Sequence, residues 1–444
     1  MQAMGNFSLP IIFASMKSVT AFALLFAWTA GLAFHGIIDQ VFLSRIAKLS
    51  KVMIAPSLTF HSIASGLSPA LFREQWMLSV AGVSVVALGM IVGHLAAIIL
   101  RVPLSLRPWF VLAVAQPNLI ALPLVLVEAI CREKENSQAS IATCIDRATT
   151  RLFTVTLLNS LCFWIFLQSY VQSYIGDTVH EDLVKSKQRV ASDEHEFLKD
   201  CGSTDGKAES SVPAIVGRTL ESTSQSLDDS TVTSTETEAS SEIANTCDKN
   251  ENHTSKRSHL CKNIKAGVLE PPSLACFLGI FFAYVSPAHR LLYAHQAPAS
   301  FLTSVLTVVG KASPVVGAII TGGSFGLLVL RLRSSSESPF KLEALGASWR
   351  LIVVTGILRV VIVPAACLGC LLFVIDSLPD DRWSRLILFF QPAGVTANVV
   401  SVLAQLLDQP DAAQFIAIVT IPQIILYVPT STILIAFGMA WGKW

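Results

Sequence analysis

Charge is the property that this sequence has least of. Asp, Glu, Lys and Arg make up only 14% of its 444 residues, whereas soluble domains carry roughly 25%. The 32 basic and 31 acidic side chains nearly cancel, so no field of one sign is available to attract nucleic acid. With 52% hydrophobic residues, the composition predicts an integral membrane protein with the lipid bilayer as a partner and without a nucleic-acid partner.

Motifs of enzymes and metal sites are missing as well. The sequence has no helical HExxH, no GxSxG and no P-loop, and its nine Cys residues show no zinc spacing. Cys367 and Cys370 form a CxxC, but in an apolar run this pair is more typical of helix packing than of redox chemistry. Away from their ends the apolar runs contain no Asp or Glu, which argues against an acidic ion relay. We therefore expect no enzyme activity, no metal and no cofactor.

Long apolar runs dominate what is present. A bilayer core requires about 20 apolar residues per helix. The run 9–34 is too long for a signal peptide and lacks a basic segment before it, so it is interpreted as the first helix. The predicted spans are 9–34, 47–66, 76–100, 108–130 and 148–175, followed by 271–293, 303–330, 348–375, 385–407 and 413–440. The second span is the least regular, because Lys48 and Lys51 lie at its start.

A polar stretch, 177–268, separates the two sets of five spans. It is rich in Ser, Thr, Asp and Glu and cannot bury enough apolar surface to offset its chain entropy, so it is predicted to be a disordered linker. Because five is odd, the second set must enter the membrane from the opposite side. We expect an all-α membrane protein with ten transmembrane helices, formed by two inverted five-helix repeats at 1–176 and 269–444.

The distribution of Lys and Arg predicts the orientation. The short loops roughly tie, and the flanks of the linker, with Lys185, Lys187 and Lys265, decide the balance. Both termini then lie outside and the linker lies in the cytosol. A cytosolic linker would leave the glycosylation sequon at Asn252 unmodified.

Prolines interrupt the fourth predicted helix of each half. Pro117 and Pro123 lie in the first of these helices, and Pro392 and Gly394 lie in the second. Proline within a helix costs about 3 kcal/mol in water, and in hydrocarbon the freed backbone groups need new partners. One proline alone would indicate a kink, but matching interruptions are typical of a transporter's binding site. A broken helix also exposes a half-helix N-terminus, which attracts anions.

Amide side chains accompany both interruptions. Asn118 directly follows the first break, and Asn398 lies six residues beyond Pro392. An amide offers donors and an acceptor, so it can bind a carboxylate without a buried charge. Gln116 and Gln391 would either do the same or cap the broken helix ends.

Three kinds of cationic or titratable side chain occur within the apolar runs. Arg359 lies in the middle of a span, where it is either a functional residue or a fixed partner of backbone carbonyls at the break. His61 serves either the transport pathway or helix packing. Lys17 and Lys311 lie nearer helix ends, from which they can reach the membrane surface.

In their order along the chain, these motifs resemble the auxin efflux carrier superfamily, which comprises the PIN-FORMED and PIN-LIKES membrane transport proteins. "AVAQPNLIALPLVLVEAICREK" resembles the fourth helix of that family, with Asn118, Pro123 and Cys131 at the expected positions. "MIAPSLTFHSIA" resembles the second helix, "LRVVIVPAACLG" the eighth and "QPAGVTANVVSVLAQLL" the ninth. The resemblance covers both halves but not the linker.

The resemblance implies a fold and an activity. The first two helices of each half would form a scaffold, and the last three would form a moving domain whose fourth and ninth helices cross at Pro117, Asn118, Pro392 and Asn398. Ser57 and His61 would face the pathway from the second helix. Some family members carry a Cys pair with the spacing of Cys131 and Cys144, which here form either a disulfide or two thiols at the membrane edge.

We therefore expect a secondary carrier that exports or sequesters indole-3-acetate or a similar small carboxylate, in the plasma membrane or the endoplasmic reticulum. An elevator or rocking motion would alternate access to a site at the crossing. Two alternatives stay open: a sodium-coupled symporter of the bile-acid type, and a membrane sensor that signals through a phosphorylated Ser/Thr-rich linker. Formation of a homodimer is also left open.

Overall fold

The computed structural model describes residues 9–118, 121–134, 137–176, 264–294, 297–334, 348–374 and 381–441. Most of the predicted linker, including Lys185, Lys187 and the sequon at Asn252, lies outside the described residues. The last part of the predicted linker, 264–268, is helical. All described residues belong to one compact unit, and within them the structure is helical apart from one isolated β-bridge.

The helices of the first half follow the apolar runs. They are α1 (Leu9–Phe34), α2 (Gln40–Leu49), α3 (Ala55–Gly66), α4 (Pro69–Ile99), α5 (Arg107–Ala115), α6 (Ala121–Lys134) and α7 (Gln138–Cys162). A π-helical turn, Ser50–Ile54, joins α2 to α3, and a second one, Phe163–Leu167, continues α7. Asp39, Ser68 and Ser137 start α2, α4 and α7, because each side chain accepts a hydrogen bond from a first-turn backbone N–H.

The second half is built in the same way. Its helices are α10 (Pro271–Tyr284), α11 (Ser286–Tyr293), α12 (Ser300–Lys311), α13 (Ser313–Ser334), α14 (Trp349–Ile357), α15 (Val363–Val374), α16 (Arg382–Phe390), α17 (Asn398–Leu406) and α18 (Pro410–Trp441). A π-helical turn, Leu358–Ile362, joins α14 to α15. The chain bends by 101° between α10 and α11, where Pro287 follows the first residue of α11.

Five helical segments of the described chain are long and apolar enough to cross a membrane. They are Pro69–Ile99, Gln138–Gly176, Ser300–Ser334, Trp349–Phe373 and Pro410–Met439, and the bent pair α10 and α11 would make a sixth. Of the other predicted spans, 9–34 forms the continuous 26-residue helix α1, and in the remaining spans the helix is shorter or interrupted. Large apolar side chains such as Trp28, Ile99 and Phe373 remain 70%, 77% and 91% exposed, which suits a surface in contact with lipid.

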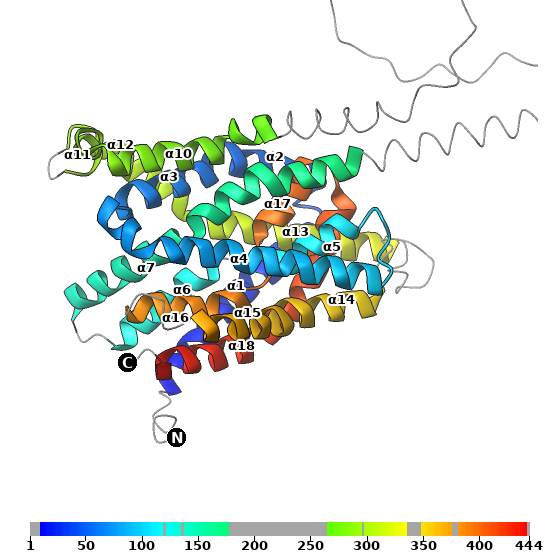
Figure 1. Ribbon diagram of the computed structural model, residues 1–444. Coiled ribbons are helices and arrows are strands. Elements are labelled where there is room, and N and C mark those ends of the chain that lie inside the picture. Colours follow the sequence, from blue (N-terminus) through cyan, green and yellow to red (C-terminus); the bar gives the residue numbers. More distant parts are fainter. Residues whose placement is uncertain are drawn as a thin grey trace, which may run out of the picture. The chain divides into compact units, whose positions relative to one another are not determined.

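Helices from the two halves pack against each other. α1 packs on α13, and α3 packs on both α10 and α12, which lie together along one edge of the helical body (Figure 1). α4 packs on α5 and α7, while α18 packs on α14 and α16. Gly322 and Gly326 on α13 allow the closest approach, because a Cβ atom at Gly326 would lie only 2.2 Å from the Ala30 carbonyl oxygen of α1. Small residues four positions apart are typical of such tight helix pairs in membranes.

Candidate functional site

Two broken helical segments meet in the interior. α5 ends at Ala115, and α16 is followed by a 3-10 turn, Gln391–Ala393, before α17 begins. The two extended segments that follow form an antiparallel bridge between Pro117 and Thr396. The Asn118 N–H donates to the Val395 carbonyl over 2.7 Å, and the Ala397 N–H donates to the Gln116 carbonyl over 2.9 Å. Each break thus satisfies backbone groups that the other leaves open.

Arg359 holds this crossing together. It lies on the π-helical turn between α14 and α15 and is completely buried. Its guanidinium donates to the carbonyl oxygens of Gly394, Val114 and Pro392 at 2.8, 3.0 and 3.0 Å. Of the two sequence interpretations, the geometry matches the fixed partner of backbone carbonyls.

Pro123 does not break a helix. It occupies the first turn of α6, where backbone N–H groups have no intrahelical acceptor and proline is tolerated. The first interruption therefore lies at Pro117 alone. Gly394 lets the second interruption pack closely against the first, since a Cβ atom there would lie 3.0 Å from the Asn118 carbonyl oxygen.

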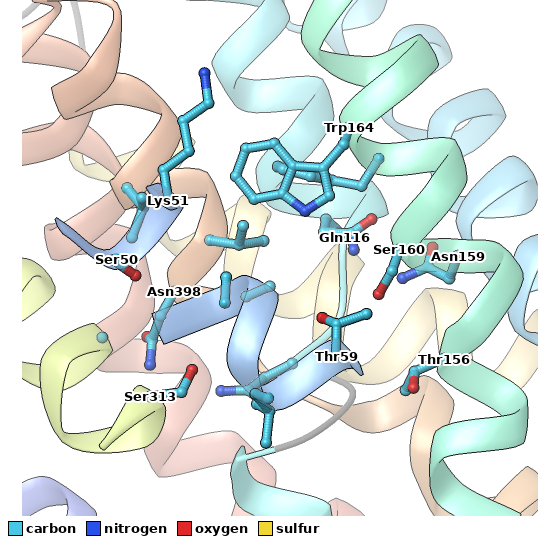
Figure 2. Close-up of a pocket in the computed structure, with 18 of the residues that line it drawn as sticks. Ser50, Lys51, Thr59, Gln116, Thr156, Asn159, Ser160, Trp164, Ser313 and Asn398 are labelled. Carbon is cyan, nitrogen blue, oxygen red and sulfur yellow. The ribbon is translucent and has the colours of Figure 1, made fainter. Parts of the chain in front are cut away.

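A cavity of about 140 Å³ lies beside the crossing (Figure 2). Its walls come from α3 and the turn before it, the first break, α7 and the turn that continues it, α13 and the start of α17. The polar or aromatic side chains that line it include Ser50, Lys51, Thr59, Gln116, Asn118, Thr156, Asn159, Ser160, Trp164, Ser313 and Asn398. Ala397 and Asn398, at the N-terminus of α17, line the cavity, and no side chain caps that terminus, so the positive end of the half-helix lies at the cavity wall.

Four of the predicted site residues line this cavity: Gln116, Pro117, Asn118 and Asn398. Asn398 fits closely against α13, because a Cβ atom at Gly317 would lie 2.5 Å from its Nδ2 atom. Its Oδ1 atom accepts a hydrogen bond from the Thr321 hydroxyl over 3.4 Å.

The other predicted residues lie elsewhere. Ser57 is buried in α3, Gln391 and Pro392 are buried in the 3-10 turn, and none of them contributes to the cavity wall. The His61 ring lies against Tyr293 and shares hydrogen bonds with the hydroxyls of Tyr293 and Thr307, at 3.3 and 3.1 Å, so its described partners belong to α11 and α12.

Sequence reasoning missed Thr59 and Asn159. Thr59 lies two positions beyond Ser57 on α3, and a two-residue offset turns a side chain by more than half a helical turn. Asn159 is a lone amide in the apolar run "LLNSLCFW", and an intramembrane amide is a signal that could have identified it. The Oδ1 atom of Asn159 and the Oε1 atom of Gln116 are buried without a hydrogen-bond partner among the described residues.

Lys51 is the one charged residue among the described residues that line the cavity. Its ammonium group forms an ion pair with Glu270 at 2.7 Å, and the Gln168 amide also donates to Glu270, over 3.0 Å. Both charged side chains are mostly buried, at 19% and 17% exposure. Figure 2 shows Lys51 and Trp164 at one end of the cavity and Ser313 and Thr156 at the other.

Cys131 and Cys144 form a disulfide, which resolves the alternative that the sequence left open. The bond joins the end of α6 to the start of α7. Arg151, farther along α7, forms an ion pair with Asp381 at the start of α16, so the same end of α7 is also linked to the second half.

Known proteins share these features over most of the chain. A family model described as "Membrane transport protein" matches residues 14–434, which include both breaks and every helix that contributes to the cavity. Protein PIN-LIKES 4 of Arabidopsis thaliana is 22% identical over 317 residues, covering 69% of this chain and 71% of that protein. The chain therefore belongs to the membrane transport protein family, within the auxin efflux carrier superfamily of PIN-FORMED and PIN-LIKES proteins.

Proposed function

We propose that the protein is a secondary transporter of a small organic anion, with indole-3-acetate or a similar carboxylate as its substrate. The observation that carries this proposal is the cavity at the crossing. It combines one cation, Lys51, with the amides of Gln116, Asn118 and Asn398 and the uncapped start of α17. These are the groups that bind a carboxylate in a site shielded from water.

The packing of the helices supports an inverted repeat of ten membrane helices. In such a repeat α1 corresponds to α10, α3 to α13, α4 to α14 and α7 to α18. The contact between α1 and α13 then corresponds to that between α10 and α3, and the contact between α4 and α7 corresponds to that between α14 and α18. The broken segments pair with each other on the axis. This pseudo-symmetry is the arrangement through which transporters alternate access.

Alternating access follows from moving one helical group against the other. α1, α3, α10 and α13 would form the scaffold, and α4 to α7 with α14 to α18 would carry the crossing in an elevator or rocking motion. An inside-negative membrane potential favours export of an anion by about 2.3 kcal/mol per charge for every 100 mV. Export toward the outside therefore requires no coupled ion.

The test is transport in proteoliposomes. Purified protein is expected to move labelled indole-3-acetate in response to an imposed potential, without sodium. Asn118→Ala and Asn398→Ala should each abolish transport, while Ser84→Ala, which loses only a bond to the Val80 carbonyl of its own helix, should not. Uptake driven by sodium would instead support the symporter, and binding without flux would support the sensor.

A further inference from the structure

The Glu270 side chain makes its hydrogen bonds to the first half of the chain and not to the helix that it precedes. It directly precedes α10, but its side chain does not cap that helix. Its carboxylate instead accepts hydrogen bonds from Lys51 and Gln168, which both belong to the first half of the chain. The ion pair therefore joins the start of the second half to the end of the cavity at which Lys51 lies.

Lys51 requires a negative partner whether or not a ligand is bound. A mostly buried ammonium without a counter-charge is costly, because the interior solvates charge poorly. Glu270 supplies this counter-charge to Lys51. A carboxylate that enters the cavity can pair with the same ammonium, which is the one charged group among the described residues that line it.

We propose that Lys51 recognises the anionic group of the substrate and that Glu270 competes for it, so that binding exchanges one carboxylate for another on Lys51. This inference rests on the proposed function and adds the residue that selects for charge. Lysine suits the exchange because its ammonium is a point charge on a flexible four-carbon chain. Gln168 continues to bind the Glu270 carboxylate after Lys51 leaves it.

The exchange predicts opposite effects of removing the two charges. Binding of labelled indole-3-acetate and of neutral indole-3-acetamide is measured on the purified full-length protein. Glu270→Gln removes the competitor and is expected to strengthen indole-3-acetate binding about tenfold, the scale of one charge-assisted hydrogen bond. Lys51→Gln is expected to weaken it about tenfold by the same reasoning. Neither variant should change the binding of the amide.

A variant with the ion pair reversed controls for loss of binding that is caused by misfolding. Lys51→Glu combined with Glu270→Lys keeps opposite charges in contact but places the acid at the cavity, so it should fold and lose indole-3-acetate binding. Lys51→Arg should restore most of the affinity that Lys51→Gln loses. Arg331→Gln serves as the control, because its ion pair with Asp411 is exposed and lies away from the cavity.

The outcomes separate this inference from the proposed function. If the wild-type protein transports indole-3-acetate but Glu270→Gln and the reversed pair bind it as the wild type does, the exchange on Lys51 is overturned and the transport function stands. If the wild type neither binds nor transports carboxylates, both proposals fail. Tighter binding in Glu270→Gln together with loss in the reversed pair supports the exchange.

Discussion

Arg359 is a buried cation whose hydrogen bonds within the described residues all go to backbone carbonyls. Its planar guanidinium reaches three carbonyls that the breaks and α5 leave available, and its charge is distributed over those dipoles. The residue thereby determines how the two broken segments are spaced at the crossing. Because the cavity wall includes Pro117 and Asn398 from those segments, Arg359 shapes the site without touching it.

Replacing Arg359 should therefore destabilise the fold. Arg359→Met leaves three buried carbonyls without their hydrogen-bond donor, each at a cost of about 1–3 kcal/mol. The thermal unfolding temperature in detergent should therefore fall sharply. Arg359→Lys keeps the positive charge but loses the planar guanidinium that reaches three carbonyls, so it should restore only part of the lost stability. If the Arg359→Met variant unfolds at the same temperature as the wild type but does not transport, Arg359 instead has a direct role in the pathway.

A second residue-scale prediction concerns Asp381, which lies outside the predicted spans. Burial alone raises the pKa of its carboxyl group, but hydrogen bonds from Ser384 and Arg151 outweigh that effect and hold the pKa below its ordinary value of 3.8. A group whose pKa falls on folding stabilises the protein above its unfolded pKa and loses that contribution as pH falls through the folded value. The wild type should thus unfold at a higher temperature than Asp381→Asn at pH 7, and the difference should shrink below about pH 3.9, the unfolded pKa. A constant difference across that range would contradict the assignment.

The sequence indicates the amides beside a proline but not the cavity's cation. Asn118 and Asn398 could be predicted because proline breaks expose backbone in hydrocarbon, where polar side chains collect. From the sequence, Lys51 marks only the irregular start of a span, since a lysine near a helix end usually reaches the membrane surface. Its role depends on Glu270, which is 219 residues away in sequence. No local pattern reports such a pairing.

At the scale of elements, α13 and α1 form the closest helix pair that the glycines reveal. Gly322 lies against the Thr29 hydroxyl and the Phe26 carbonyl, and Gly326 lies against the Ala30 carbonyl, so the two backbones approach closely. This contact links the halves on the scaffold side, in the arrangement proposed above.

One added methyl group tests that contact. Gly326→Ala would place a Cβ atom 2.2 Å from the Ala30 carbonyl oxygen, and the helices must separate to accept it. Overpacking of this kind costs about 1–3 kcal/mol, which should appear as a lower unfolding temperature. The matched control is Gly31→Ala on α1, where no atom lies within 4 Å of the new methyl group. Equal stability of the two variants would contradict the tight packing.

Element boundaries were predictable where apolar length decided them and less so where backbone geometry did. The range 9–34 coincides with α1, because nothing within it competes with a helix. The range 271–293 is split by a 101° bend, and 303–330 is divided into α12 and α13 near Ala312. Hydropathy reports how much apolar chain is available, but not the angle between consecutive helices.

At the scale of the whole molecule, the disulfide and the cavity's ion pair lie at opposite ends of one helical segment. Cys144 lies near the start of Gln138–Gly176, and Gln168, which binds Glu270, lies near its end. Gln168 lies 24 positions beyond Cys144, a rise of about 36 Å at 1.5 Å per residue, which exceeds the roughly 30 Å hydrocarbon core of a bilayer. Disulfides persist on the oxidising side of a membrane. The Lys51 end of the cavity is therefore expected on the cytosolic side.

Thiol labelling checks this orientation. A membrane-impermeant maleimide added to sealed vesicles with their cytosolic face outward should not label Ser137→Cys until the membrane is opened. The thiols of the predicted cytosolic linker, Cys201, Cys247 and Cys261, should react immediately and serve as the internal control. Labelling of Ser137→Cys in sealed vesicles would reverse the predicted topology.

The bridge between Pro117 and Thr396 also has a consequence for biosynthesis. The Asn118 N–H and the Gln116 carbonyl have their backbone partners at Val395 and Ala397, so about 280 residues must be made before these two hydrogen bonds can form. At about 5–20 residues per second, the ribosome needs roughly 15–60 s for that stretch. During this interval we expect the Asn118 N–H and the Gln116 carbonyl to lack the partners that they have in the folded protein. In the ten-helix arrangement proposed above, the fourth segment would then be hydrated or bound to the insertion machinery until the ninth segment is made.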